Sequence, residues 1–133
     1  MGLLAGRRPT DLGVRPDGRL APVRADRENA VSSFADTPYH RIAPIAFSGD
    51  PDAAFARMRA TVEAMPGAAV IDHDARWIRA EFTTPVMGFV DDVELLLDER
   101  ARVFHVRSAS RLGRSDFGTN RRRVEAIRAA FGR

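Results

Sequence analysis

The alternation of apolar and polar residues predicts a sheet built from several short strands. In residues 77–83, Ile78, Ala80 and Phe82 occupy one face and charged side chains the other, which is the period of a half-buried strand. Further strand-like runs lie at residues 41–47, 69–71, 90–97 and 102–110. The connections that join the runs at 69–71, 77–83, 90–97 and 102–110 are short, which favours antiparallel hairpins.

Two other segments carry apolar residues at helical spacing, and each is predicted to form an amphipathic helix. The apolar stripes are Phe55, Met58, Val62 and Met65 in the first and Val124, Ile127 and Phe131 in the second. Asp50 and Thr119 are the candidate N-caps of these helices. In the second helix, Arg121 and Glu125 have the i,i+4 spacing of a stabilising ion pair.

The element order is therefore β-α-β-β-β-β-α, which is typical of the α+β class. We expect a two-layer sandwich in which both helices cover one face of a mainly antiparallel sheet. Residues 1–39 show little periodicity and recurrent Gly and Pro, so they are predicted to form an extended N-terminal arm over the domain. Residues 40–133 then form a single α+β domain, in line with the length of the chain.

Composition removes several kinds of chemistry. The chain has no cysteine, which excludes disulfides and thiolate metal sites, and all 21 of its Lys and Arg residues are arginine. A net charge of +3 is too small for a typical nucleic-acid-binding protein. No apolar run is long enough to span a bilayer. The expected location is the cytoplasm if Met1 is the native start, and the periplasm or a membrane surface if a leader was removed.

The most unusual segment is residues 107–123, which holds six arginines and one acid, Asp116. Three of these arginines stand where the second helix should begin, and positive charge is unfavourable at that end of a helix. A local rule broken this plainly indicates a compensating partner or a function.

An acidic trio, Asp91, Asp92 and Glu94, precedes the arginines. Its oxygen ligands would suit a hard cation, but in a strand Asp92 and Glu94 share one face and Asp91 points to the other. We therefore predict that these acids, with Asp116, are structural ion-pair partners of the arginines. No metal site and no cofactor is predicted.

The leading functional hypothesis is a small, non-enzymatic domain that binds an anionic ligand or a protein partner. Guanidinium groups, hydroxyls and the free N–H groups of a helix start together suit an anion. The candidate ligand-binding residues are Arg107, Ser108, Ser110, Arg111, Arg114, Asn120 and Arg121. The competing interpretation of the same residues is a purely structural salt-bridge network.

Two alternatives come from other functional classes. An enzyme would have an acid–base site built from Asp91, Asp92, His105 and Arg107, which requires His105 to reach a carboxylate and open to a cleft. A membrane-surface accessory protein would use its arginines against acidic lipids. No catalytic residue is assigned in the leading hypothesis, and the oligomeric state stays open.

The chain also resembles a known family, the bacterial and plastid domain of unknown function 1499. The resemblance rests on residues 11–14, 29–33, 89–94 and 107–111, together with Gly113, Ser115, Asp116, Gly118, Asn120 and Arg121. Members of that family often carry a cysteine where this chain has Ala30, and another near Val23. The resemblance covers nearly the whole chain and supports the domain boundaries, but it implies no reaction.

Overall fold

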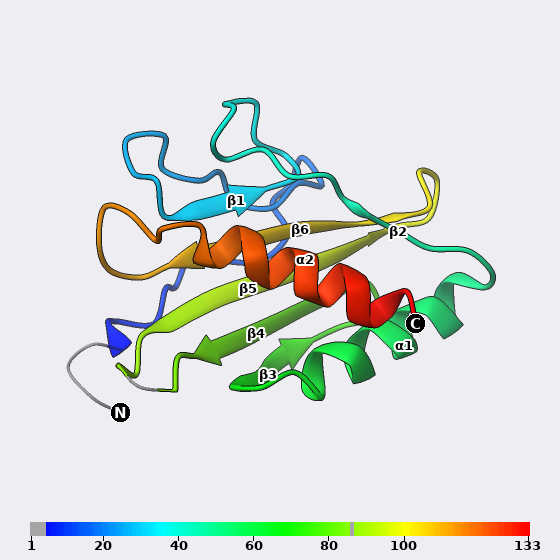
Figure 1. The fold of residues 1–133 in the computed structure, drawn as a ribbon. Coiled ribbons are helices and arrows are strands. Elements are labelled where there is room, and N and C mark those ends of the chain that lie inside the picture. The colour runs from blue at the N-terminus through cyan, green and yellow to red at the C-terminus, as the bar shows by residue number, and fades with distance from the viewer. Residues whose placement is uncertain (1–4, 86) are drawn as a thin grey trace.

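A computed structural model describes residues 5–85 and 87–133 and shows a six-stranded antiparallel sheet with two helices (Figure 1). The α+β class predicted from the sequence is thereby confirmed. In chain order the elements are β1 (Ala30–Ser32), β2 (Ile45–Ala46), α1 (Pro51–Glu63), β3 (Ala68–His73), β4 (Trp77–Thr83), β5 (Val90–Asp98), β6 (Val103–Ser110) and α2 (Thr119–Phe131). The strands follow the order β1-β6-β5-β4-β3, and β2 pairs with β6 as well.

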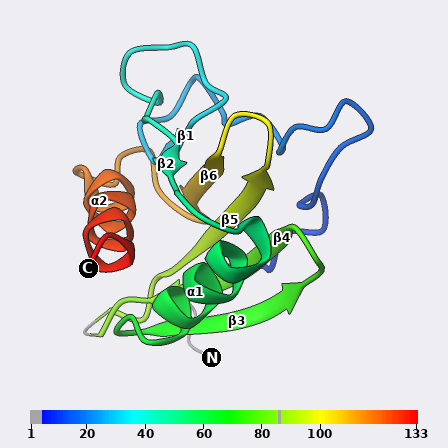
Figure 2. The same cartoon turned by 90° about the vertical axis from the view of Figure 1, so that its right-hand side faces the viewer.

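The sheet separates two layers that differ in kind. Figure 2 shows α2 and the blue N-terminal arm on opposite sides of strands β5 and β6. We call these two sides the helix face and the arm face, and we use "arm" for residues 5–29. None of the described helices is long and apolar enough to cross a membrane.

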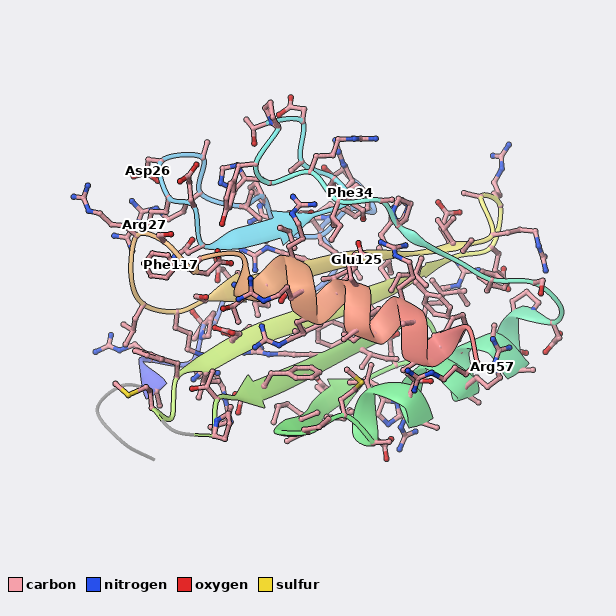
Figure 3. The ribbon with its side chains drawn as sticks, in the orientation of Figure 1. Asp26, Arg27, Phe34, Arg57, Phe117 and Glu125 are labelled. Carbon is pink, nitrogen blue, oxygen red and sulfur yellow. The ribbon has the colours of Figure 1, made fainter. Side chains whose placement is uncertain are left out.

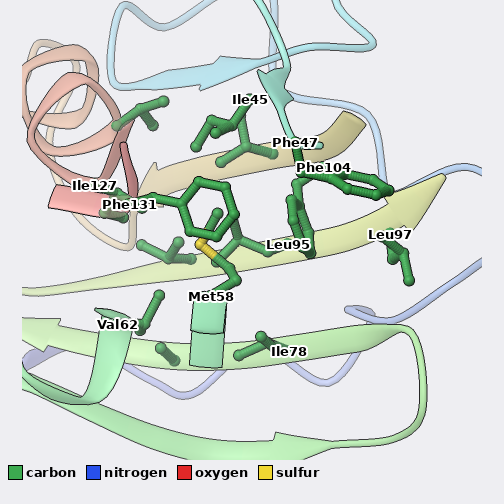
Figure 4. Packing of buried hydrophobic residues seen from close by; sticks show 14 of the residues in the cluster. Ile45, Phe47, Met58, Val62, Ile78, Leu95, Leu97, Phe104, Ile127 and Phe131 are labelled. Carbon is green, nitrogen blue, oxygen red and sulfur yellow. The ribbon is translucent and has the colours of Figure 1, made fainter. Parts of the chain in front are cut away.

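The hydrophobic core fills the space between the sheet and the two helices (Figure 4). Phe104 from β6 lies at its centre, with ring centroids 5.5 Å from Phe47 and 5.6 Å from Phe131. From α1, Met58 and Val62 are fully buried. The predicted apolar stripes of both helices therefore face the sheet, and burial of these side chains supplies most of the driving force for folding.

Three sequence-based predictions about local structure need correction. Residues 30–32, assigned to the arm, form β1 and pair with β6, and three residues are too few for an alternation to show. Thr119 is the first residue of α2 and not its N-cap, which is Gly118 at a φ of 82°. The predicted Arg121–Glu125 ion pair does not form among the described residues, because Glu125 accepts a hydrogen bond from Arg128 instead.

Candidate functional site

Strand register arranges the side chains of the arm face in rows that cross β4, β5 and β6. We name the first row, Trp77–Leu96–His105, the aromatic row, and the second, Arg79–Glu94–Arg107, the charged row. Asp92 and Glu94 project to this face, whereas Asp91 contacts helix α2 on the other. The split of the acidic trio predicted from strand alternation is thus confirmed.

Arg111 forms a buried ion-pair cluster next to the charged row. It donates to both carboxylate oxygens of Asp92, at 2.8 and 2.9 Å, and to Glu81 at 2.7 Å. The side chains of Arg111 and Asp92 are only 3% and 2% exposed. Arg8 of the arm donates to the same Glu81 carboxylate, and with Arg111 it lowers the pKa of Glu81 against the opposing effect of burial. Bidentate pairing of this kind is strong and geometrically specific.

The side chains of the charged row form hydrogen bonds with the arm. The Oε2 atom of Glu94 accepts the indole N–H of Trp77 at 2.9 Å and the backbone N–H of Gly13 at 2.8 Å. Burial raises the pKa of Glu94 and lowers that of Arg107. Arg107 donates to the carbonyls of Ala21 and Pro22.

A second polar network lies on the helix face, at the start of α2. Asn120 is fully buried, and its side-chain oxygen accepts from the Ser108 hydroxyl at 2.6 Å. Its amide nitrogen donates to Ser110 and Asp116, each at 2.8 Å. Arg123, one of the arginines near the helix start, forms an ion pair of 2.7 Å with Asp91. The buried polar side chains here satisfy one another, as buried polar groups must.

Asp116 supplies the negative charge that the start of α2 needs. Its carboxylate accepts the backbone N–H groups of Gly118 and Asn120, and the Tyr39 hydroxyl at 2.5 Å. Burial by itself would raise the pKa of Asp116, but the hydrogen bonds from Tyr39 and Asn120 lower it overall. The position that an external anion would take at this helix start is therefore filled by a side chain of the protein itself.

The seven candidate ligand-binding residues do not converge on one space, although Ser110 and Arg111 both line one cleft. Arg107 and Arg111 lie on the arm face, whereas Ser108, Ser110 and Asn120 form the network on the helix face. Arg121 donates to the carbonyls of Tyr39 and Arg41. Arg114 is exposed, and within the described chain its guanidinium makes no hydrogen bond or ion pair. Neighbouring residues of a strand point to opposite faces of the sheet, so the sequence already indicates that Arg107 and Ser108 lie on different faces.

A cleft of about 280 Å³ opens beside the loop between β6 and α2. We call it the loop cleft. Among the residues that line it, Phe89, Leu112 and Phe117 are apolar and Asp91, Ser110 and Thr119 are polar. Phe117, labelled in Figure 3, is 86% exposed. Phe117 is not among the site residues predicted from the sequence, because the arginines around it are the more prominent feature of that segment.

In the described part of the chain, His105 is not hydrogen-bonded to any other member of the predicted acid–base site, although Arg107 lies in the neighbouring row. Its Nε2 is 3.1 Å from Asp98 Oδ2, and its Nδ1 is 3.3 Å from the Ser33 hydroxyl. It lines a groove of about 780 Å³ together with Trp77 and Asp98. Asp92 is committed to Arg111 and Asp91 points to the opposite face, so the structure gives His105 a carboxylate partner that the sequence did not suggest. No group of three or more metal-binding side chains occurs among the described residues.

Residues 21–131 match a protein family described as "Protein of unknown function (DUF1499)". The chain belongs to this family. No curated protein shows significant similarity to it. The matched region contains the whole sheet and both helices but begins after most of the arm, so the residues that cover the charged row from Ala5 to Gly13 lie outside it.

Proposed function

We propose that this domain of the DUF1499 family is a non-enzymatic binding module that recognises an acidic segment of a protein partner. The recognition surface is the loop cleft and the start of α2, where an apolar side chain of the partner enters the cleft. The observation that carries the proposal is Phe117, which is 86% exposed and adopts a φ of +52°.

The conformation of Phe117 is unfavourable and its side chain gains little from the fold. A left-handed backbone costs an L-residue about 1–2 kcal/mol, and an exposed ring recovers none of this by burial. Backbone outliers of this kind cluster at functional sites. Leu112 and Phe89, which line the same cleft, are 41% and 36% exposed. Contiguous apolar surface with a polar rim is typical of protein-binding sites.

Two exposed arginines beside the cleft favour an acidic partner, because the acids of its lining, Asp91 and Asp116, are already engaged within the protein. Arg114 and Arg122 are both exposed. Arg122 donates to the carbonyl oxygen of Phe117 at 2.9 Å, which holds its guanidinium next to the exposed ring. Carboxylates of a partner would find paired donors there. A small free anion is less favoured, because Asp116 already occupies the helix start.

Selection from a random peptide library on the immobilised protein tests this proposal. Peptides should be enriched that combine several Asp or Glu residues with one central apolar residue. Loss of an aromatic anchor costs at least about 2 kcal/mol, so Phe117→Ser should weaken binding of a selected peptide by about 30-fold in fluorescence anisotropy. Arg114→Glu should weaken it less, and the loss should shrink as salt is added.

Val14→Arg is the matched control, because Val14 is exposed on the opposite side of the sheet. It should leave peptide binding unchanged. The proposal fails if no peptide is enriched over the Phe117→Ser protein. It also fails if the wild-type protein binds vesicles of acidic lipid through Phe117 and binds no acidic peptide, since that result identifies a membrane surface as the partner.

A further inference from the structure

The arm covers the charged row of the sheet but leaves the aromatic row open. Trp77, Leu96 and His105 lie side by side across three strands and form the floor of the groove of about 780 Å³, which we call the Trp77 groove. Val14 in the arm and Phe34 after β1 also line it. A volume of this size is in the range of small-molecule sites, which are mainly apolar with a few fixed polar groups.

Hydrogen bonds fix the floor of the groove in place. The Trp77 indole N–H is tied to Glu94, so the ring cannot rotate freely. His105 stacks on Phe34 at 4.3 Å between ring centroids. The Ser33 hydroxyl accepts the Val106 N–H at 2.9 Å and lies 3.3 Å from His105 Nδ1 and 3.4 Å from the Val106 carbonyl oxygen. On its other side, His105 Nε2 is 3.1 Å from Asp98 Oδ2. A rigid floor lowers the entropic cost of binding.

The charged groups at the rim offer carboxylate oxygens to a ligand. Arg76 is paired with Glu99 at 2.7 Å. Asp74 accepts the backbone N–H groups of Arg76 and Trp77. Asp98 is 36% exposed: its Oδ1 accepts the backbone N–H of Ala101 and its Oδ2 lies 3.1 Å from His105 Nε2, and these contacts lower its pKa against burial. Each oxygen keeps a second lone pair for a ligand. Arg100 is the one arginine of the groove lining without an ion-pair partner in the described part of the chain, and it is exposed, so the groove offers a ligand acceptors and no buried positive charge.

We propose that the Trp77 groove binds a small, flat, uncharged aromatic molecule that stacks on the Trp77 indole, beside Leu96 and the stacked Phe34–His105 pair, and donates one hydrogen bond to Asp98. The site is separate from the loop cleft and does not depend on the proposed peptide recognition. Stacking on the fixed indole supplies affinity, and the carboxylate selects for a donor group on the ligand.

Trp77 is the only tryptophan of the chain, so its fluorescence reports directly on the groove. N-phenyl-1-naphthylamine is a suitable probe because it is uncharged, aromatic and carries one N–H donor. It should quench the Trp77 emission saturably with a Kd below about 100 µM. Val14→Arg, which places a charged side chain at the mouth of the groove, should remove the quenching. Leu112→Arg, which changes the loop cleft in the same way, should leave it unchanged.

The hydrogen bond is tested with a second probe, the N-methylated analogue that lacks the N–H. The wild-type protein should prefer the N–H probe by about tenfold, as expected for a hydrogen bond to a charged acceptor. Asp98→Asn keeps an acceptor for His105 but removes the charge, and it should reduce this preference. Absence of saturable quenching, equal quenching in Val14→Arg, or loss in Leu112→Arg instead would each overturn the proposal. Equal affinity for the two probes would overturn the role of Asp98.

Discussion

The two faces of the sheet are covered by different means, and on the arm face the cover leaves the aromatic row open. On the helix face, α1 and α2 make most of their backbone hydrogen bonds internally and pack mainly through apolar side chains, with a polar network only at the start of α2. On the arm face, the covering segment has no regular structure, and its carbonyls need donors from elsewhere. Arg79 and Arg107 provide them to Pro9, Ala21 and Pro22. These half-buried arginines supply the hydrogen bonds that an irregular covering segment cannot form with a neighbouring strand.

The strongest test of this comparison is Arg111→Ala. The substitution leaves Asp92 and Glu81 as buried carboxylates without their shared cation, and breaking a buried pair in this way costs about 3–5 kcal/mol. Urea denaturation measures the loss directly. Arg24→Ala is the control, because Arg24 and its partner Asp26 are 62% and 66% exposed and exposed ion pairs contribute little to stability. Equal stability of the two variants would contradict a charge-based closure of the arm face.

A smaller effect is expected from Asp116→Asn on the helix face. The change removes the anionic cap of α2 and weakens the Tyr39 hydrogen bond, which should cost about 1–2 kcal/mol at pH 7. The folded-state pKa of Asp116 is lowered from 3.8, so the wild-type contribution is present above that pH and is lost as the pH falls through the folded value. Thermal unfolding between about pH 2 and 6 should therefore show a shallower decline for the variant. If the unfolding temperature falls with pH equally in both proteins, Asp116 does not contribute to acid unfolding.

Tyr39 gives a spectroscopic view of the same network. Burial, together with the adjacent Asp116 carboxylate, raises the pKa of Tyr39 from 10.0 to about 12. Because Tyr39 is the only tyrosine, an ultraviolet titration of phenolate absorbance reports this group alone. The midpoint should lie near 12 in the folded protein, move down in Asp116→Asn, and return to about 10 in denaturant. A folded midpoint near the ordinary value would show that the hydroxyl does not donate to Asp116 in solution.

The sequence predicts the helices and strands and the sheet face that a side chain occupies, but not the hydrogen-bond and ion-pair partners of the polar side chains. The alternation in residues 77–83 and the split of Asp91 from Asp92 follow from side-chain period, which is local. The pairing of Arg111 with Glu81, and of His105 with Asp98, depends on register between strands and on turn geometry, which a single sequence does not encode in readable form. The cap of α2 was misassigned because the carboxylate that serves it lies two residues before Gly118.

The smallest change in stability is expected for Phe117→Gly, which tests whether the Phe117 ring serves binding or folding. Phe117→Gly relieves the positive φ, which offsets the greater freedom of glycine in the unfolded chain, so stability should stay within about 1 kcal/mol of wild type or rise. Binding of the selected acidic peptide should nevertheless fall by about 30-fold. Leu112→Gly is the matched comparison: Leu112 has no positive φ among the described backbone outliers, so there glycine can only destabilise. If Phe117→Gly loses as much stability as Leu112→Gly, the exposed ring contributes to folding, and its conformation no longer argues for a partner.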